Sequence, residues 1–264
     1  MVLNPLTFWI AAGAVTLAAA YAYLRWVWFF RDPVRVPPAD PAAILAPADG
    51  KVIYVRPIEE GAVWSFKLGR PIPLPEITHS ADPPRSGWVV GIYMSPLDVH
   101  YVYAPAFGRV DEVSHHTAAR NWPMVDMWEY IRLTWLHRAV DLLGKRHHLK
   151  NERLTLRLCM EGTDRPAAGE DLRPAEADRR AERADARGAE GDLWLVEIAD
   201  RFVNKIRCFV QPGQVVRAGQ KLSFISRGSQ VDVIMPDPQV HVVVRPGMQV
   251  YGALSVIARR EGRP

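Results

Sequence analysis

Short runs of β-branched and aromatic residues, each closed by Gly, Pro or Asp, recur along most of this chain. The clearest are DGKVIYV, WVVGIYM, VHYVYAP, GRVDEVS, RLTLRLCM, LWLVEIA and NKIRCFV. Residues of these types favour extended backbone, and the residues that close the runs are typical of turns. The pattern therefore predicts an all-β or mostly β body. At 264 residues the chain is long enough to bury a sizeable core without disulfide support.

Two pairs of segments repeat within the chain. FVQPGQVVRAGQKLSFI at 209–225 and VVRPGMQVYGALSVI at 243–257 share a V-x-P-G-x-x-V pattern, and APADGKV at 46–52 and APAFGRV at 104–110 share A-P-A-x-G-x-V. Glycine-turned strands of this kind resemble those of flattened β-barrels of the lipoyl-carrier type. We therefore expect a flattened barrel or sandwich with repeated hairpins, a likeness of architecture that says nothing about function.

The N-terminal region differs from the rest. From Val2 to Leu24 no side chain is charged, and the stretch is nearly long enough to cross a bilayer as a helix. Three arginines follow this stretch, which is the wrong polarity for a cleaved signal peptide and predicts a cytoplasmic C-terminal side: Arg25, Arg31 and Arg35. We expect residues 1–30 to form a membrane-anchor helix at the cytoplasmic face of the cell membrane, spanning or lying in the bilayer. A buried core helix is the alternative.

The anchor is followed by five prolines between Pro33 and Pro47, which predict an extended tether. Apolar side chains at helical spacing then predict one amphipathic helix within 121–148, with Asn121 as its N-cap. Its basic and aromatic residues suit either a lipid surface or packing against the body with a solvated basic face. The pair His147-His148 is interpreted as exposed polarity at the helix end, because adjacent helical residues point in different directions.

Composition excludes several classes of function. The formal net charge is only +4 and no basic-aromatic module is visible, so no nucleic-acid partner is predicted. Cys159 and Cys208 each lie in an apolar run and neither belongs to a CxxC, which predicts two reduced, buried thiols and no metal site. Segment 161–192 holds a single large aliphatic residue, Leu172, and is expected to be a flexible charged insertion.

A few polar residues interrupt the β pattern. Asp49 lies in PADGK, His100 in MSPLDVH, and Gly228-Ser229 in ISRGSQVDVIMP. Each has an ordinary explanation: Asp before Gly suits a turn, a single His can be structural, and Gly in a strand marks a bulge.

Taken together, the motifs resemble one family. FFRDPVRVPP, PADGKV, MSPLDVHYVYAP, NERLTLRL, VEIADRFVNKIRC and SRGSQVDVIMP occur in the order and wording of the short bacterial and archaeal-type phosphatidylserine decarboxylase proenzymes. The resemblance covers the anchor and nearly all of 28–257. It implies that residues 31–264 form a pyruvoyl-dependent decarboxylase that converts phosphatidylserine to phosphatidylethanolamine and CO2 through a Schiff base, with membrane lipid as its partner.

The resemblance also implies that the enzyme makes its own cofactor. The Ser229 hydroxyl would attack the Gly228 carbonyl, since glycine allows a bent backbone and leaves the approach open. β-Elimination would then split the protein into chains 1–228 and 229–264, which stay associated, and residue 229 would become the pyruvoyl group. By the same resemblance His100 transfers protons, as a histidine near its ordinary pKa can, and Asp49 orients the group that activates Ser229.

One position departs from part of the wider family. A second histidine found there three residues after the first is replaced here by Tyr103. The base that starts self-cleavage is therefore open: His100 could act in both steps, the strained backbone with Asp49 could suffice, and three histidines remain as remote substitutes: His115, His116 and His241.

Two other functions remain open. The first is a membrane-tethered β-barrel adaptor that never cleaves. The second is a pyruvoyl decarboxylase acting on another amino-acid-headed substrate. The protein could form a homo-oligomer under any of these three functions.

Overall fold

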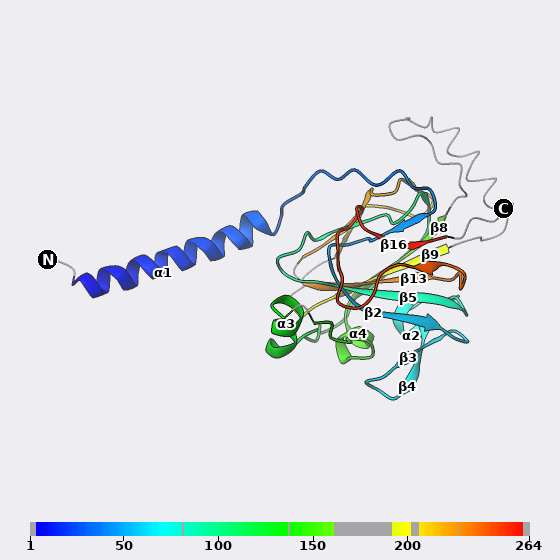
Figure 1. Cartoon of the computed structure of the whole chain (residues 1–264), viewed down its shortest axis with the longest axis horizontal. Helices are drawn as coiled ribbons and strands as arrows, with labels where there is room; N and C mark the ends of the chain where they lie inside the picture. The colour runs from blue at the N-terminus through cyan, green and yellow to red at the C-terminus, as the bar shows by residue number, and fades with distance from the viewer. Residues whose placement is uncertain are drawn as a thin grey trace.

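The structure is a computed structural model, and it describes residues 4–80, 82–136, 138–160, 192–201, 206–226 and 228–260. The predicted charged insertion lies outside these ranges, apart from Asp192. The described chain is mostly β, as predicted, and one long helix projects from one end of the body (Figure 1).

The helices are α1 (Pro5–Tyr23), continued by a π-helical turn (Leu24–Trp28), α2 (Leu74–Thr78), α3 (Met127–Thr134) and α4 (Arg146–Lys150). The strands are β1 (Ala43–Leu45), β2 (Gly50–Ile58), β3 (Ala62–Ser65), β4 (Arg70–Pro73), β5 (Gly87–Met94), β6 (Tyr101–Tyr103), β7 (Gly108–His116), β8 (Arg153–Met160), β9 (Asp192–Ala199), β10 (Ile206–Cys208), β11 (Val215–Val216), β12 (Lys221–Ile225), β13 (Ser229–Met235), β14 (His241–Val242), β15 (Gln249–Val250) and β16 (Val256–Arg259).

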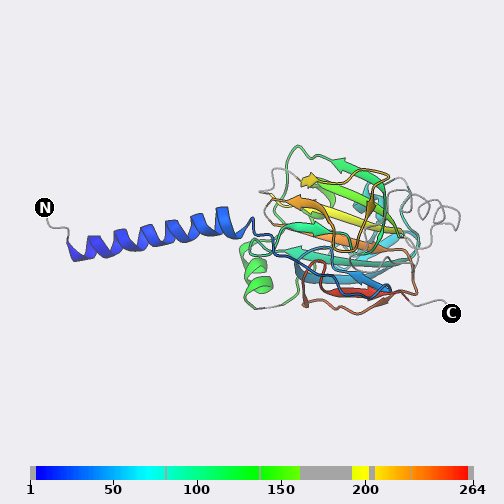
Figure 2. The ribbon, with the colours of Figure 1, turned by 90° about the horizontal axis from the view of Figure 1, so that it is seen from above.

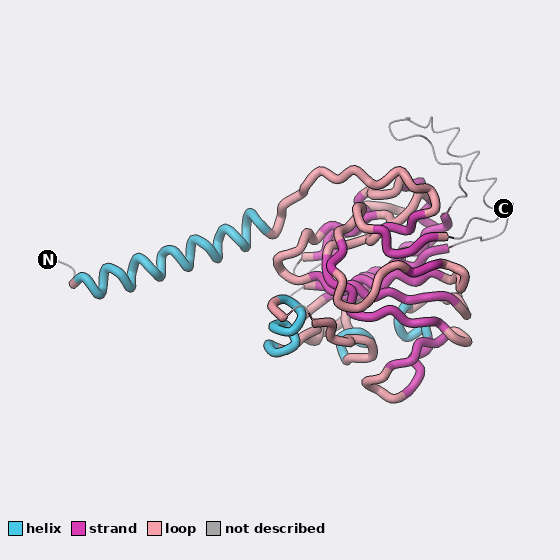
Figure 3. Tube along the Cα trace, in the orientation of Figure 1, coloured by secondary structure: helices cyan, strands magenta, loops and turns pink. Residues whose placement is uncertain are grey.

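Eight strands form one antiparallel sheet in the order β11-β7-β8-β9-β13-β5-β2-β15. The sheet is curled (Figures 2 and 3). One face packs against two three-stranded sheets, β1-β16-β14 and β10-β12-β6, and the apolar side chains between them make the larger core. The opposite face is covered by α2, α3, α4 and the β3-β4 hairpin, which enclose a second core. Strand β13 is therefore central, with a core on each face.

The repeats take equivalent places at opposite edges of this sheet. β11 pairs with the start of β7, and β15 pairs with the start of β2, so each V-x-P-G copy meets one A-P-A-x-G-x-V copy. The second strand of each copy, β12 or β16, joins a three-stranded sheet. The repeat is thus a structural duplication, but each copy spans two sheets and does not pair with itself.

The predicted helix over 121–148 is shorter and broken. α3 begins after Asp126, whose side chain accepts from the Glu129 amide in a capping box, and the predicted cap Asn121 instead accepts from the Glu152 amide at 2.9 Å. The interpretation of His147 and His148 as exposed was wrong: both are buried, because α4 packs on the inner strands of the sheet.

The N-terminal segment Pro5–Trp28 is long and apolar enough to cross a membrane, and none of that span is buried against the body. This supports an anchor over a buried core helix. The tether that follows has no regular secondary structure from Arg31 to Asp40, as predicted, but its polar side chains bond to the body, among them Asp32 to Lys221 and Asp40 to Arg259. Both cysteines are free, but neither is buried as expected: Cys159 is partly exposed and Cys208 is exposed.

Candidate active site at the start of strand β13

Gly228 and Ser229 lie where the chain crosses from one sheet to another. β12 belongs to a three-stranded sheet and β13 to the large sheet, so the Gly-Ser pair ends a connection and does not interrupt a strand. Gly228 has a φ of +51°, a left-handed conformation that other residues adopt with strain. Ser229 is completely buried between β5 and β9, with its hydroxyl 3.0 Å from the sulfur of Met94.

His100 lies beside this bond. Its Nε2 accepts a hydrogen bond from the Gly228 amide at 3.3 Å, and its ring lies against Phe29 at a tilt of 37°, with the centroids 4.1 Å apart. Burial, with a smaller contribution from the Arg31 charge, lowers the pKa of His100 to about 3. The imidazole is therefore neutral at pH 7 with an unprotonated Nε2, which differs from the near-ordinary pKa expected from the sequence.

Asp49 has different partners. Its carboxylate receives two hydrogen bonds from the Arg35 guanidinium at 2.5 and 2.9 Å, and one from the Gly252 amide at 2.8 Å. Among the described residues, no hydrogen bond joins Asp49 to His100 or Ser229. An ion pair this well satisfied holds the tether against the turn before β2.

Tyr103 completes this second cluster. The Arg35 guanidinium lies 4.8 Å from the centre of its ring, and its buried hydroxyl has no hydrogen-bond partner in the described part of the chain. Burial raises the pKa of Tyr103 to about 12, so the phenol stays protonated at neutral pH. The structure thus brings His100 to Gly228 and Ser229, and Asp49 to Arg35 and Tyr103. The tether connects the two groups, because Phe29 contacts the first and Arg35 the second.

The three substitute histidines make other contacts. His115 bonds to Glu152 at 2.9 Å, His116 bonds to Ser114 at 3.1 Å, and His241 is an exposed residue of β14. Across the described ranges, no group of three or more His, Cys, Asp or Glu side chains is arranged to hold a metal ion.

Sequence reasoning overlooked a buried acid near the site. Glu197 in β9 is fully buried and faces the same core as Ser229, since Glu197 pairs with Val231 and Ala199 pairs with Ser229. Both carboxyl oxygens lie within hydrogen-bond reach of the Ser223 hydroxyl, at 2.6 and 2.7 Å. Desolvation raises the pKa of Glu197 to about 8. A charged residue inside the apolar run LWLVEIA was the signal available in the sequence.

Comparisons with known proteins identify the family of this chain. A family model described as phosphatidylserine decarboxylase matches residues 23–258. The phosphatidylserine decarboxylase proenzyme of Chlorobium limicola is 26% identical over 241 residues, which cover 91% of this chain and 82% of that protein. The proenzyme of the same name from Gluconacetobacter diazotrophicus is 28% identical over 267 residues, which cover 96% of this chain and 91% of that protein. The putative archaetidylserine decarboxylase proenzyme of Methanocaldococcus jannaschii is 28% identical over 242 residues, which cover 92% of this chain and 93% of that protein. This chain therefore belongs to the phosphatidylserine decarboxylase family, which confirms the family and the enzyme class that its motifs predicted.

Proposed function

We propose that this protein is a self-processing, pyruvoyl-dependent enzyme that decarboxylates phosphatidylserine to phosphatidylethanolamine at the cytoplasmic face of the membrane. Residues 1–30 anchor it, and 31–264 form the catalytic domain. The single observation that carries the proposal is the Gly228–Ser229 bond: a left-handed glycine, a buried serine at a strand start, and a neutral histidine on the glycine amide.

Self-cleavage follows from the chemistry of these groups. The Ser229 oxygen adds to the Gly228 carbonyl carbon, and the amide nitrogen leaves that carbon as an amine, which gives an ester. Removal of the Ser229 Cα proton then breaks the bond between Cβ and oxygen and releases Gly228 as a carboxylate. The dehydroalanine that remains takes up water and loses ammonia. We assign the proton transfers to His100, because its unprotonated Nε2 accepts a hydrogen bond from the amide of Gly228, the residue directly before Ser229.

The residues around position 229 fit a pyruvoyl group. Once formed, that group supplies a ketone that condenses with an amine and accepts electrons while CO2 is lost. Position 229 is buried and largely apolar around its side chain, which disfavours a charged carboxylate and favours its loss.

The two product chains would stay together. Strand β13 pairs along its length with β5 and β9, and β15 and β16 of the smaller chain pair with β2 and β1 of the larger one. Hydrogen bonds and core packing on both sides of β13 replace the lost covalent connection.

A membrane substrate suits the surface at this end of the body. α3 lies beside the end of the anchor in two views (Figures 1 and 2). Its Leu133 is buried against the body, whereas Met127, Trp128 and Trp135 are 76%, 63% and 76% exposed. Exposed tryptophans beside a membrane helix are typical of the lipid interface. We propose that α3 and the residue after it dock on the same bilayer, which brings His100 and Ser229 toward the lipid headgroups.

Denaturing mass spectrometry of purified protein tests the proposal. The expected result is two chains, 1–228 and 229–264, with the smaller one lacking a free amine at its N-terminus. Ser229→Ala should yield one intact chain without decarboxylase activity. An intact wild-type chain, or a Ser229→Ala variant with full function, would support the non-cleaving adaptor.

The lipid substrate has a second candidate. One relative is named for archaetidylserine, so archaetidylserine is an alternative substrate. Release of CO2 from each of the two lipids in matched micelles, with free serine as a third arm, distinguishes these substrates from a soluble amino acid.

A further inference from the structure

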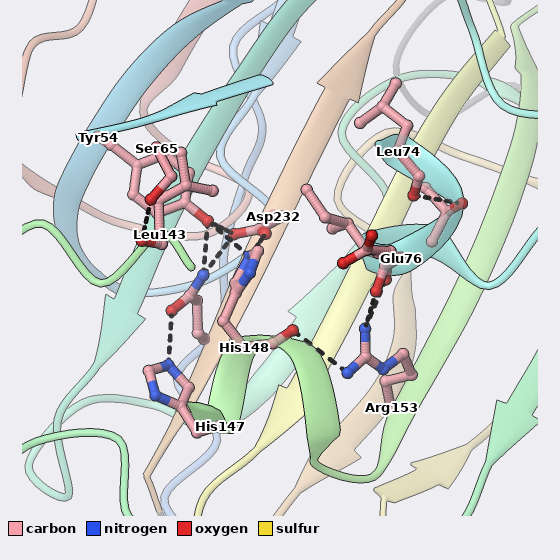
Figure 4. A network of polar contacts seen from close by, with 12 residues as sticks. Tyr54, Ser65, Leu74, Glu76, Leu143, His147, His148, Arg153 and Asp232 are labelled. Atoms are coloured by element: carbon pink, nitrogen blue, oxygen red, sulfur yellow. Dashed lines mark hydrogen bonds and ion pairs between the residues drawn. The ribbon is translucent and has the colours of Figure 1, made fainter. Parts of the chain in front are cut away.

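A buried polar network lies on the face of β13 opposite Ser229. Asp232 is fully buried and accepts three hydrogen bonds: from the Tyr54 hydroxyl at 2.6 Å, from the Gln230 amide group at 2.8 Å, and from His148 Nε2 at 2.8 Å (Figure 4). Gln230 also donates to the Tyr54 hydroxyl at 2.6 Å, and its oxygen lies 3.4 Å from His147 Nε2. Polar groups at this depth are costly unless they are paired. Among the described residues, the side-chain oxygen and nitrogen atoms of Tyr54, Gln230 and Asp232 pair within the network, and of the histidine nitrogens only Nδ1 of His147 and of His148 has no partner.

The backbone is shaped to make this network possible. Tyr54 is on β2 and Asp232 is on β13, with β5 between them. Gly91 of β5 pairs with both residues, and a Cβ there would collide with the Tyr54 ring. Glycine therefore lets the ring lie flat across β5 and carry its hydroxyl to the second strand over.

The histidine side of the network is also held rigidly. α4 carries His147 and His148, and the buried Arg153 donates to the His148 carbonyl at 3.2 Å and to the Ile77 carbonyl at 2.8 Å. Arg153 thus fixes α4 to α2 and to the sheet, so both imidazoles meet β13 at set positions (Figure 4).

Every bond of this network that leaves β13 joins the two predicted product chains. Gln230 and Asp232 are the second and fourth residues after the proposed cleavage point, whereas Tyr54, His147 and His148 belong to chain 1–228. Cleavage turns residue 229 into a chain end, and the first residues of a free strand end fray readily. Fraying would move position 229 away from His100.

We infer that Gln230 and Asp232, held by Tyr54, His147 and His148, are positioning residues that keep the new N-terminal end of chain 229–264 in register after self-cleavage. This rests on the proposed self-cleavage. Before cleavage the covalent bond to Gly228 already holds the strand, so the network matters most in the mature enzyme. None of these side chains faces the Ser229 side of the sheet, so they act through the backbone and not on substrate.

Hydrogen exchange of residues 229–235 in the full-length protein tests this inference. Tyr54→Phe removes one hydroxyl and keeps the ring on Gly91. In cleaved protein we expect it to speed exchange at the first amides of β13 by about tenfold, the effect of one hydrogen bond to a charged group. The same substitution in the uncleaved Ser229→Ala chain should change that exchange by less than about twofold. kcat should fall in the cleaved variant while KM stays near the wild-type value.

Two further variants keep the result interpretable. Thr155→Val is the matched control, because its buried hydroxyl bonds only the Thr78 carbonyl within chain 1–228, and it should leave β13 unchanged. His148→Leu removes a different bond and should repeat the Tyr54→Phe result. Unchanged exchange in both cleaved variants, or an equal rise with and without cleavage, would overturn the positioning role alone. A wild-type chain that stays intact by mass would overturn the cleavage and this inference together.

Discussion

Glu197→Gln should make the stability of this protein less dependent on pH. The Glu197 carboxyl is fully buried, and desolvation, which the bond to Ser223 only partly offsets, raises its pKa from 4.5 to about 8. Between these two values the folded protein keeps a proton that the unfolded chain releases. The stabilisation is therefore complete below about pH 4.5 and is lost as the pH rises through about 8.

The size of the effect follows from the two pKa values. Each pH unit between them is worth about 1.4 kcal/mol, so the free energy of unfolding should fall by about 5 kcal/mol between pH 4.5 and pH 8 through this group alone. Glutamine cannot ionise and still bonds to Ser223. The variant should match the wild type near pH 5 and exceed its stability at pH 9.

Urea unfolding of the full chain in detergent, followed by tryptophan fluorescence from pH 5 to 9, measures this difference. The Ser229→Ala background keeps the protein as one chain, so that one transition is observed. Glu112→Gln is the control, since Glu112 also bonds to a serine, Ser80, but is only half-buried. Equal pH slopes for the Glu197→Gln variant and its parent would refute the argument.

Three further predictions concern the site and the membrane. Burial lowers the pKa of His100 to about 3, so protonation of this residue should not slow self-cleavage between pH 8 and about 5. The rate is measured by quenching samples over time and separating the chains on a gel. A rate that falls with an apparent pKa near 6.5 would contradict the neutral, buried state of His100. Asp49→Ala leaves the buried Arg35 charge without its partner and should lower the free energy of unfolding by about 3 kcal/mol in the same urea assay. A loss below about 1 kcal/mol would show that water solvates the Arg35 charge in place of the carboxylate. Replacing Trp128 and Trp135 together by Ser should weaken binding to anionic vesicles by at least about tenfold in a flotation assay, and unchanged flotation would place α3 away from the bilayer.

The strands and the anchor could be predicted because local residue types determine them. Runs of β-branched residues between turn residues became strands, and the uncharged stretch after Val2 became one long exposed helix. The repeats were visible for the same reason, although only the fold shows that each copy is shared between two sheets. Local signals failed at 121–148, where apolar spacing continued past the end of α3 at Thr134.

The Gly228-Ser229 pair, His100 and Asp49 were found through motifs, but motifs carry no information about charge state or contact. Only the fold shows that His100 is buried against Phe29 and that Asp49 is bound by Arg35. His148 and Asp232 are 84 residues apart, and nothing in either neighbourhood predicts their bond. The local order of residue types thus determined which elements form. The burial and the partners of each ionisable group depended on the packing of distant strands, because desolvation and pairing are properties of the surroundings and not of the residue itself.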